Sequence, residues 1–349
     1  GAIAIAQALC AHPAIFRLDL GFNQIGGKGL RAIASLLLSS SSLLCLDLSG
    51  NSFWSRLSLL APSSMSALAP LGRALSNDSC RLQLLHLDQA DIDHKGLTAL
   101  VDGLLSNHVL LNLRLAENKL DARSGLTLGT LLSGNDTLTN LDLRDNQLKD
   151  AGAQALAAGL VENTSLRCLV LWNNGISVAG ISSFALPLGT ASPLQIFDVG
   201  GNSVGAQGVL ALKESLWRNN SLHTIGLANA QLGDEGGIAV AEVIEGNAHV
   251  QRLDLRRNYL GVAGLMALRL SMKTNEALLE VALDAVNEMS MSETRELQER
   301  FQAEIRAACD QNSAAIKSSG AAAPPELSTM GGPSAMDLLG KLGIACAGP

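Results

Sequence analysis

The sequence has few aromatic and few charged residues, and it has no long uninterrupted apolar run. Aromatic residues make up 3% and charged residues 16% of the 349 residues, and 32 acidic against 25 basic side chains give a net charge of −7. Proteins that bind nucleic-acid backbones carry clustered Lys and Arg, which this chain lacks. No apolar run approaches the ~18 residues of a membrane-spanning helix. We therefore expect neither a nucleic-acid partner nor a membrane partner.

Paired cysteines are also missing. The six cysteines form no C-x-x-C pair, which argues against a structural zinc site, and they are too sparse for a disulfide-stapled secreted domain. We expect reduced thiols and a cytoplasmic location, with the nucleus as a further compartment. The first residue is Gly1 and not Met, so an earlier segment, including a signal peptide, stays an open alternative.

Motifs for catalysis and for metal or phosphate binding are absent from the sequence. The histidines include no H-E-x-x-H pair, and the glycines around Lys28 lack the spacing and the Ser/Thr of a phosphate-binding loop. Asp91 and Asp93 precede His94 where a strand should turn into a helix, and we prefer helix capping to metal binding there. The sequence predicts no enzyme activity, no cofactor and no metal site.

The pattern L-x-L-x-x-N recurs along the chain. Its last position falls at Asn23, Asn51, Ala90, Asn118, Asn146, Asn174, Asn202, Ala230, Asn258 and Val286, so that eight of the nine intervals are 28 residues and one is 39. This period is typical of leucine-rich repeats of the long, helix-containing kind. The two leucines should point inward from a short strand, the Asn should satisfy backbone groups at the turn, and a Gly six residues later should open a helix such as 151–160.

The repeats predict an α/β fold, a monomeric leucine-rich-repeat solenoid or horseshoe with ribonuclease-inhibitor-like repeats, a parallel concave sheet and convex helices. About ten repeats should fill residues 1–290, with an inserted surface loop near 54–70 that accounts for the long interval. The N-x-[ST] sequons at Asn135, Asn163 and Asn219 share one repeat position, so for them and for Asn77 we prefer a structural role to glycosylation.

After the repeats, the sequence predicts a capping helix and a tail. Leu297, Phe301 and Ile305 form a stripe at spacing four, and Ser290 and Glu293 resemble a capping box, so we expect a helix within 291–310 that covers the end of the solenoid. Residues 311–349 are rich in Ser, Ala, Gly and Pro, and we expect them to be disordered.

The positions between the buried leucines should lie on the concave face, because side chains alternate along a strand. Trp172 stands out there, because the same position in other repeats holds small or charged residues. Trp and Arg are enriched at protein interfaces. The predicted contact residues are Arg114, Asp142, Arg144, Trp172, Asp198, Asp254 and Arg256. The alternatives are that Trp172 packs on Arg144 without a ligand, and that the aspartates are solvated residues neutralised by nearby arginines.

Several strings resemble the leucine-rich-repeat regulatory subunits of the type-1 serine/threonine protein phosphatase. They are Leu169-Val170-Leu171-Trp172-Asn173-Asn174, Ala239-Val240-Ala241-Glu242, Leu253-Asp254-Leu255-Arg256-Arg257-Asn258, Gly264-Leu265-Met266-Ala267-Leu268, and Ala303-Glu304-Ile305 with Cys309. The resemblance extends from about residue 80 to 312. It implies that the chain binds and inhibits the phosphatase catalytic subunit as a non-catalytic scaffold.

Phosphatase regulators generally dock through a basic-x-Val/Ile-x-aromatic segment, which in this family lies in a long extension after the repeats. Here only Val170-x-Trp172 matches the apolar part, no basic residue precedes it, and it lies inside a repeat strand. Two other classes stay open. A Ran-type GTPase-activating protein usually ends in an acidic tail, and ribonuclease inhibitors or NOD-like ligand sensors alternate two repeat types, whereas this chain has a nearly uncharged tail and uniform repeats.

Overall fold

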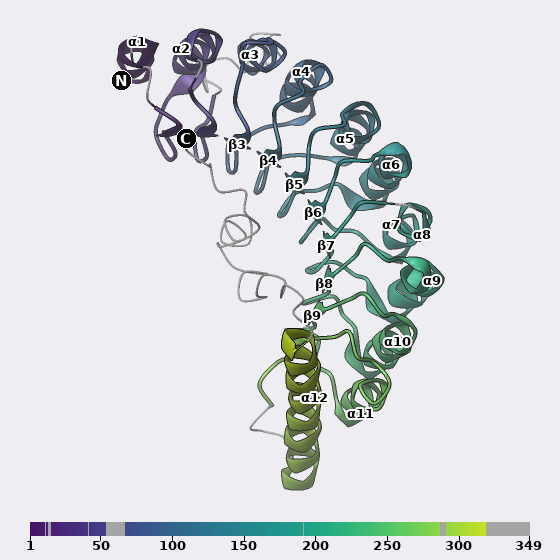
Figure 1. Cartoon of the computed structure of the whole chain (residues 1–349). Helices are drawn as coiled ribbons and strands as arrows, with labels where there is room; N and C mark the ends of the chain where they lie inside the picture. Colours follow the sequence, from purple (N-terminus) through teal and green to yellow (C-terminus); the bar gives the residue numbers. More distant parts are fainter. Residues whose placement is uncertain are drawn as a thin grey trace. The chain divides into compact units, whose positions relative to one another are not determined.

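The computed structural model describes residues 1–10, 12, 15–40, 42–53, 67–190, 192–286 and 291–318. They divide into two compact units, Gly1–Asn174 and the residues from Gly175 onward. Each unit is built of strand–helix repeats, as the 28-residue period predicts, and the fold is an α/β leucine-rich-repeat solenoid. Within each unit the strands line one side and the helices the other (Figure 1).

The described residues of the first unit form six short strands that follow each other in chain order, each parallel to the next. The strands are β1 (Arg17–Asp19), β2 (Cys45–Asp47), β3 (Leu84–His86), β4 (Asn112–Arg114), β5 (Asn140–Asp142) and β6 (Cys168–Val170). The helices are α1 (Ala2–Cys10), α2 (Gly26–Ser39), α3 (Ala69–Leu75), α4 (His94–Leu104), α5 (Ala122–Gly134) and α6 (Lys149–Glu162).

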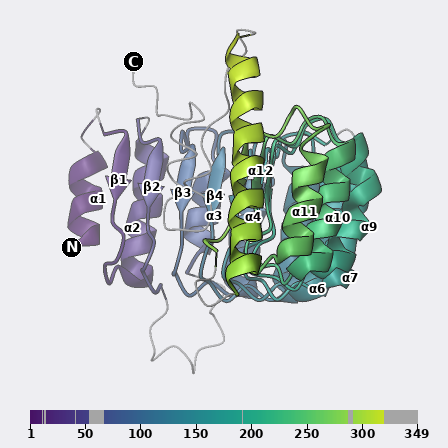
Figure 2. The same ribbon diagram turned by 90° about the horizontal axis from the view of Figure 1, so that it is seen from below.

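The second unit repeats this plan and ends in a long helix. Its parallel strands are β7 (Ile196–Asp198), β8 (Thr224–Gly226), β9 (Arg252–Asp254) and β10 (Glu280–Ala282). Its helices are α7 (Val178–Ser182), α8 (Ala185–Gly189), α9 (Gly205–Arg218), α10 (Gly233–Gly246), α11 (Val262–Ser271) and α12 (Ser292–Ser318). Figure 2 shows α12 extending past the ends of α10 and α11. None of the described helices is both long and apolar enough to cross a membrane.

The strand register places equivalent repeat positions side by side, for example Leu85 opposite Leu113 and Leu113 opposite Leu141. Both leucines of each L-x-L pair are buried in most repeats, as Leu46 and Leu48 illustrate with no exposed surface. The prediction that the leucines form the core is therefore confirmed. The side chains between them lie on the opposite side of the sheet, which we call the strand face.

The repeat asparagine connects each repeat to the one before it. The Asn118 amide nitrogen Nδ2 donates to the carbonyls of Leu87 at 2.8 Å and Ala116 at 3.1 Å, and Oδ1 accepts from the backbone N–H groups of Ala90 at 3.0 Å and Ile92 at 2.9 Å. Asn146 and Asn258 bond in the same manner. Because these backbone groups are buried, the asparagine removes the cost of leaving them unpaired.

A second asparagine row contains the sequons. Asn135, Asn163 and Asn219 are at most 6% exposed. Asn135 donates to the carbonyls of Leu104 and Asn107 and accepts from Leu138 N–H at 2.8 Å. The prediction of a structural role is confirmed for these three residues. The same row continues at Asn107, Asn247 and Asn275, which lack sequons and were not predicted. Asn77 differs, because it is exposed and its Oδ1 accepts from Ser79 in a turn.

The repeat glycine lies within the first turn of the helix and does not open it, which corrects the prediction. Gly152, for example, lies in α6, which begins at Lys149 and so extends past both ends of the predicted 151–160. Its role is close packing, because a Cβ atom built on Gly125 of α5 would overlap the backbone of Gly152. Neighbouring helices can therefore approach backbone to backbone, and a side chain at this position would push them apart.

The predicted insertion at 54–70 mostly lies outside the described residues, which resume at Ala67. Its last two residues, Ala69 and Pro70, begin helix α3, so the expectation of a loop is wrong for them. Proline fits there because it stands in the first turn, where its missing N–H would have no helical partner.

Helix α12 packs against α11 and β10, as a capping helix should. Phe301, Ile305 and Cys309 are at most 5% exposed, but Leu297 is 37% exposed, so its predicted place in the buried stripe is wrong. A step of four residues exceeds the 3.6-residue turn, so a stripe at spacing four drifts around the helix. Gln302 on the neighbouring row is 7% exposed and lies on the buried side, and Gln298 donates to the carbonyl of Leu260, between β9 and α11.

The helix also continues beyond its predicted end at residue 310. Residues 311–318 are helical, not disordered, and Asn312 donates to the carbonyls of Asn275 at 3.1 Å and Leu278 at 2.9 Å. These two bonds satisfy carbonyl groups at the end of the second asparagine row. The composition of the segment did not reveal this contact. The remainder of the predicted tail, 319–349, lies outside the described residues.

Candidate protein-binding surface

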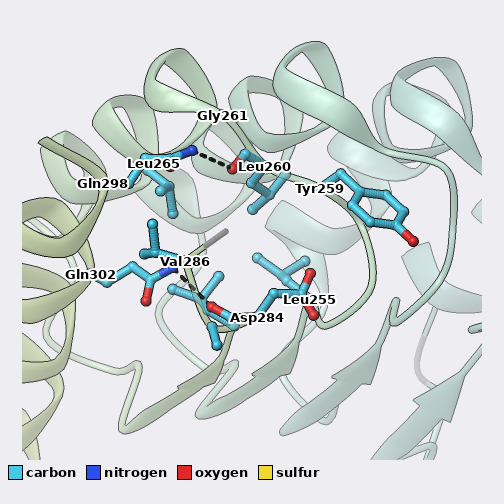
Figure 3. A pocket seen from close by; sticks show the side chains of 11 residues that line it. Leu255, Tyr259, Leu260, Gly261, Leu265, Asp284, Val286, Gln298 and Gln302 are labelled. Atoms are coloured by element: carbon cyan, nitrogen blue, oxygen red, sulfur yellow. Dashed lines mark hydrogen bonds between the residues drawn. The ribbon is translucent and has the colours of Figure 1, made fainter. Parts of the chain in front are cut away.

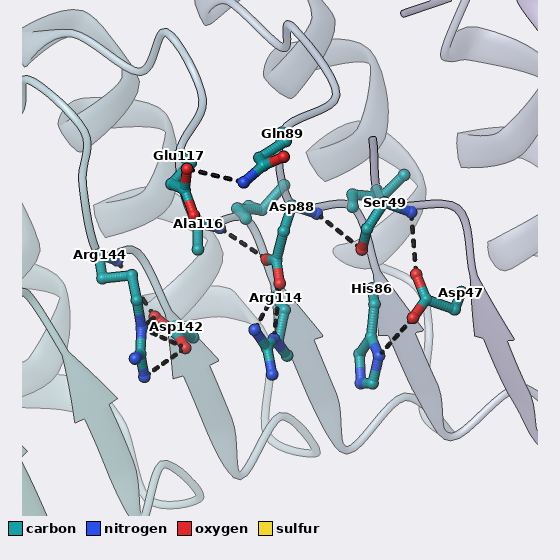
Figure 4. A network of polar contacts seen from close by, with 12 residues as sticks. Asp47, Ser49, His86, Asp88, Gln89, Arg114, Ala116, Glu117, Asp142 and Arg144 are labelled. Carbon is teal, nitrogen blue, oxygen red and sulfur yellow. Dashed lines mark hydrogen bonds and ion pairs between the residues drawn. The ribbon is translucent and has the colours of Figure 1, made fainter. Parts of the chain in front are cut away.

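In the first unit the strand face carries a network of charged and polar side chains (Figure 4). It runs from Asp47 and Ser49 on one repeat, through His86 and Asp88, to Arg114. The strand register explains this order, because Asp47 lies opposite His86 and His86 lies opposite Arg114. Side chains directly opposite on adjacent strands are close enough to bond.

Arg114 bonds to a carboxylate of the preceding repeat. Its Nε donates to Asp88 Oδ2 at 2.9 Å, and Nη2 lies 2.5 Å from the same oxygen. Asp88 Oδ1 also accepts from the Ala116 N–H at 2.8 Å. Burial raises the pKa of Asp88, helped by the nearby Asp142 carboxylate and opposed by Arg114. Arg114 is therefore a half-buried member of the network and not a free surface cation.

Asp142 and Arg144 form an ion pair within one repeat. Arg144 Nε lies 3.0 and 2.9 Å from the two carboxylate oxygens of Asp142, and Nη2 lies 2.9 Å from Oδ2. Asp142 is 7% exposed. A guanidinium that bonds both oxygens holds the carboxylate in one orientation.

The second unit contains the same arrangement at Asp254 and Arg256. Arg256 Nε donates to Asp254 Oδ1 at 2.9 Å, and Nη2 lies 2.5 Å from Oδ2. The hydrogen bond from Arg256 to Asp254 is the main cause that raises the pKa of Arg256. Asp198 is 5% exposed, and its Oδ1 accepts from the Gly200 N–H. Arginines thus neutralise Asp142 and Asp254, as predicted. These two carboxylates and that of Asp198 are buried and not solvated, which corrects that part of the interpretation.

Trp172 follows β6 in the first unit. Its preceding neighbour, Leu171, is fully buried in the core, so alternation places the indole on the strand face, where it is half-buried. Its carbonyl accepts from the Asp145 N–H at 2.8 Å and from Asn174 Nδ2 at 3.1 Å. The prediction of a partly exposed Trp172 is confirmed. Its role in binding stays a prediction.

The structure therefore groups Arg114, Asp142, Arg144 and Trp172 on one strand face, and it groups Asp198, Asp254 and Arg256 on that of the second unit. Sequence reasoning did not select Asp47, His86 or Asp88 for the site. Their strand-face positions carried the necessary signal, because the register sets Asp47 opposite His86 and His86 opposite Arg114, and Asp88 follows two residues after His86.

The Asp47 carboxylate links the start of this network to its backbone. Its Oδ1 accepts from the Ser49 N–H at 2.9 Å, and its Oδ2 lies 3.5 Å from His86 Nδ1. Burial alone would raise the pKa of Asp47, but the hydrogen bonds from His86 and Ser49 outweigh it and lower the pKa from 3.8 to about 2. The charged carboxylate is therefore the form that the fold favours.

We predict that Asp47→Asn lowers the free energy of unfolding by about 2 kcal/mol at pH 6. Since the pKa is lowered in the folded chain, this contribution is complete above the unfolded pKa of about 4 and is lost as the pH falls through about 2. Urea titrations of the parent chain and of Asp47→Asn give the difference between their free energies of unfolding. This difference should be about half as large at pH 3 as at pH 6. A difference that is the same at both pH values would contradict this assignment.

Candidate groups for chemistry other than binding are few in the described part of the chain. No cluster of three or more His, Cys, Asp or Glu side chains there could hold a metal ion. Asp93 instead caps α4, accepting from the Gly96 N–H at 2.9 Å, which confirms the capping prediction for this residue. The described cysteines are free thiols, and burial raises the pKa of Cys309 to about 11, so this thiol stays protonated at neutral pH.

Comparison with known proteins supports the repeat assignment. The family model described as "Leucine Rich repeat" matches residues 17–34, 134–157, 162–185, 218–241 and 246–268. No curated protein matches the sequence significantly. Among solved structures, the chain shows a low similarity to an internalin from Listeria monocytogenes, with 15% identity, 81% of this chain and 89% of that chain covered, and a TM-score of 0.33. The 28-residue period, the strand–helix units and the matches to the repeat model make this chain a leucine-rich-repeat protein.

Proposed function

We propose that this chain is a non-catalytic protein-binding scaffold and that the strand face of its first unit contacts the partner. The observation that carries the proposal is Trp172, a large aromatic side chain that stays half-exposed on this face. The flanking Arg144 and Arg114 are already held by carboxylates, so they are ordered before a partner arrives. Ordered Arg and Trp side chains lose little conformational entropy on binding.

We further propose the type-1 serine/threonine phosphatase catalytic subunit as the partner and inhibition as the effect. This step depends on the resemblance of the Trp172-Asn173-Asn174 string and of the terminal helix to the phosphatase regulators. Docking of Val170-x-Trp172 in the manner of a short extended motif is disfavoured, because Val170 is 7% exposed and its carbonyl accepts from the Leu143 N–H. The contact would therefore involve the folded strand face.

The partner is tested by titrating the purified chain against the type-1 catalytic subunit and, separately, against a Ran-type GTPase loaded with GTP. We expect phosphatase binding and inhibition, weaker than for a family member with the docking segment, and no change in GTP hydrolysis. Stimulated GTP hydrolysis would replace this proposal with the GTPase-activating function. Binding of neither protein would leave the scaffold role with a different partner, and a ribonuclease or small-ligand assay would then test the ribonuclease-inhibitor and NOD-like classes.

Trp172→Ala should weaken phosphatase binding by about 2 kcal/mol, or roughly 30-fold in Kd, if the indole is an interface anchor. Trp217→Ala is the matched control. Trp217 is 41% exposed on α9 in the second unit, so its loss removes a more exposed indole from a helix and not from the strand face. Calorimetric titration of both variants gives the comparison. Equal losses in the two variants, or none in Trp172→Ala, would rule out the indole as the anchor.

A further inference from the structure

A cavity of about 510 Å³ lies in the second unit between the last two repeats and the capping helix α12 (Figure 3). Its volume falls in the range of about 300–1,000 Å³ that is usual for ligand sites. Leucine side chains, among them Leu255, Leu260, Leu265 and Leu283, form much of its lining. Polar groups come from the Asp284 carboxylate and the amides of Gln298 and Gln302.

Gln298 supplies a hydrogen-bond acceptor that is not used. Its Nε2 donates to the carbonyl of Leu260 at 3.4 Å, whereas its Oε1 is buried without a hydrogen-bond partner. The contact with the Leu260 carbonyl favours this orientation of the amide, because a flipped amide would place two oxygens beside each other. A buried acceptor left unpaired is costly, and it indicates that a donor belongs in this cavity.

The other polar groups of the cavity strengthen its preference for a donor. Both ends of the Gln302 amide are bonded, since Nε2 donates to the Asp284 carbonyl at 3.0 Å and Oε1 accepts from Arg306. The Asp284 carboxylate accepts from the Arg257 N–H through Oδ1, which leaves Oδ2 with acceptor capacity. The nearby cation Arg256 is bound by Asp254. The charged group that lines the cavity is thus the Asp284 carboxylate, an acceptor with a negative charge.

The rim adds an exposed aromatic side chain. Tyr259 is 87% exposed, and its positive φ of 53° is shared by the equivalent turn residues Asp91, Gly175 and Gln231, so it belongs to the geometry of the repeat turn. Exposed tyrosine is typical of protein interfaces. An aromatic ring at the mouth can also stack with a guanidinium group.

We propose that this cavity binds an arginine side chain of a partner protein, an inference that rests on the proposed scaffold function. The leucines would contact the aliphatic stem of the arginine. The planar guanidinium has five N–H donors and can bond the Asp284 carboxylate and Gln298 Oε1 together, whereas a lysine ammonium is a compact charge with a strong hydration shell. An acidic or purely apolar ligand would leave these acceptors without a donor.

The test uses the full chain with isotope-labelled leucine methyl groups and N-acetyl-arginine N-methylamide as the probe. We expect shifts of the Leu260, Leu265 and Leu283 methyl signals that saturate at probe concentrations on the order of 10 mM, because a small ligand binds weakly. The matched citrulline derivative has nearly the same shape without the charge, and it should bind at least about fivefold more weakly. Equal binding of the two probes, or no shift of these methyls at about 50 mM, would overturn the proposal.

Asp284→Asn should weaken arginine binding at least about fivefold, and asparagine can still accept the Arg257 N–H, so the turn should survive. Gln298→Leu removes the unused acceptor and provides a second test if the first variant does not fold. Glu296→Gln removes an exposed charge from the same helix and should bind like the parent chain. Unchanged affinity in both Asp284→Asn and Gln298→Leu would refute the site. Because no phosphatase is used, this test can fail or succeed independently of the proposed partner.

Discussion

Replacing Asn118 with leucine should lower the free energy of unfolding of the first unit by about 4 kcal/mol. The side chain is 7% exposed and makes four hydrogen bonds to backbone groups, two of them to N–H groups of the preceding repeat. Leucine has a similar volume, so the packing changes little, but the backbone groups lose their partners. Urea denaturation followed by circular dichroism measures the loss.

Asn23→Leu is the matched control in the first repeat. Asn23 is exposed and donates to the carbonyls of Leu20 and Gly21, and the Leu20 carbonyl keeps a second partner in Asn51 Nδ2. We expect this variant to lose less than about 1 kcal/mol. If Asn118→Leu and Asn23→Leu lower the free energy of unfolding by the same amount, the buried asparagine does not have the bridging role.

Gly159→Ala should destabilise the first unit by about 3 kcal/mol, although alanine is the better helix former by roughly 1 kcal/mol. A Cβ atom at Gly159 of α6 would overlap the backbone of Gly129 in α5. Because backbone cannot rotate away as a side chain can, the two helices would have to separate. The sign of the effect is decisive, since helix propensity alone predicts a more stable variant.

Gly134→Ala, at the end of α5, separates the gain in helix propensity from the cost of a clash with backbone. A Cβ atom there would meet Leu105 Cδ2 at 2.9 Å, the far end of a side chain that can move. We expect a change between zero and a gain of about 1 kcal/mol in urea titrations. A Gly159→Ala variant as stable as Gly134→Ala would show that α5 and α6 tolerate a wider separation.

The ion pairs of the strand face show where sequence reasoning stopped. Asp142 ends β5 and Arg144 follows two residues later, so their proximity follows from alternation along the extended chain. Arg114 has the uncharged Ala116 at the corresponding position and bonds instead to Asp88, 26 residues earlier. That choice depends on which neighbouring repeat offers a carboxylate and on the rotamer that reaches it, and neither is encoded in the period.

The sequence by itself determined the repeat length, the buried leucines, the strand face and the capping helix, because periods of 2, 3.6 and 28 residues are local properties of the chain. Tertiary structure decided that α12 continues to Ser318, that Leu297 is exposed, and that a cavity with an unused acceptor lies beside Gln298. These features arise where α12 packs on the last repeat, at residues with no counterpart in the other repeats. Only the geometry of that contact fixes which side chains it covers and which polar atoms it leaves unpaired.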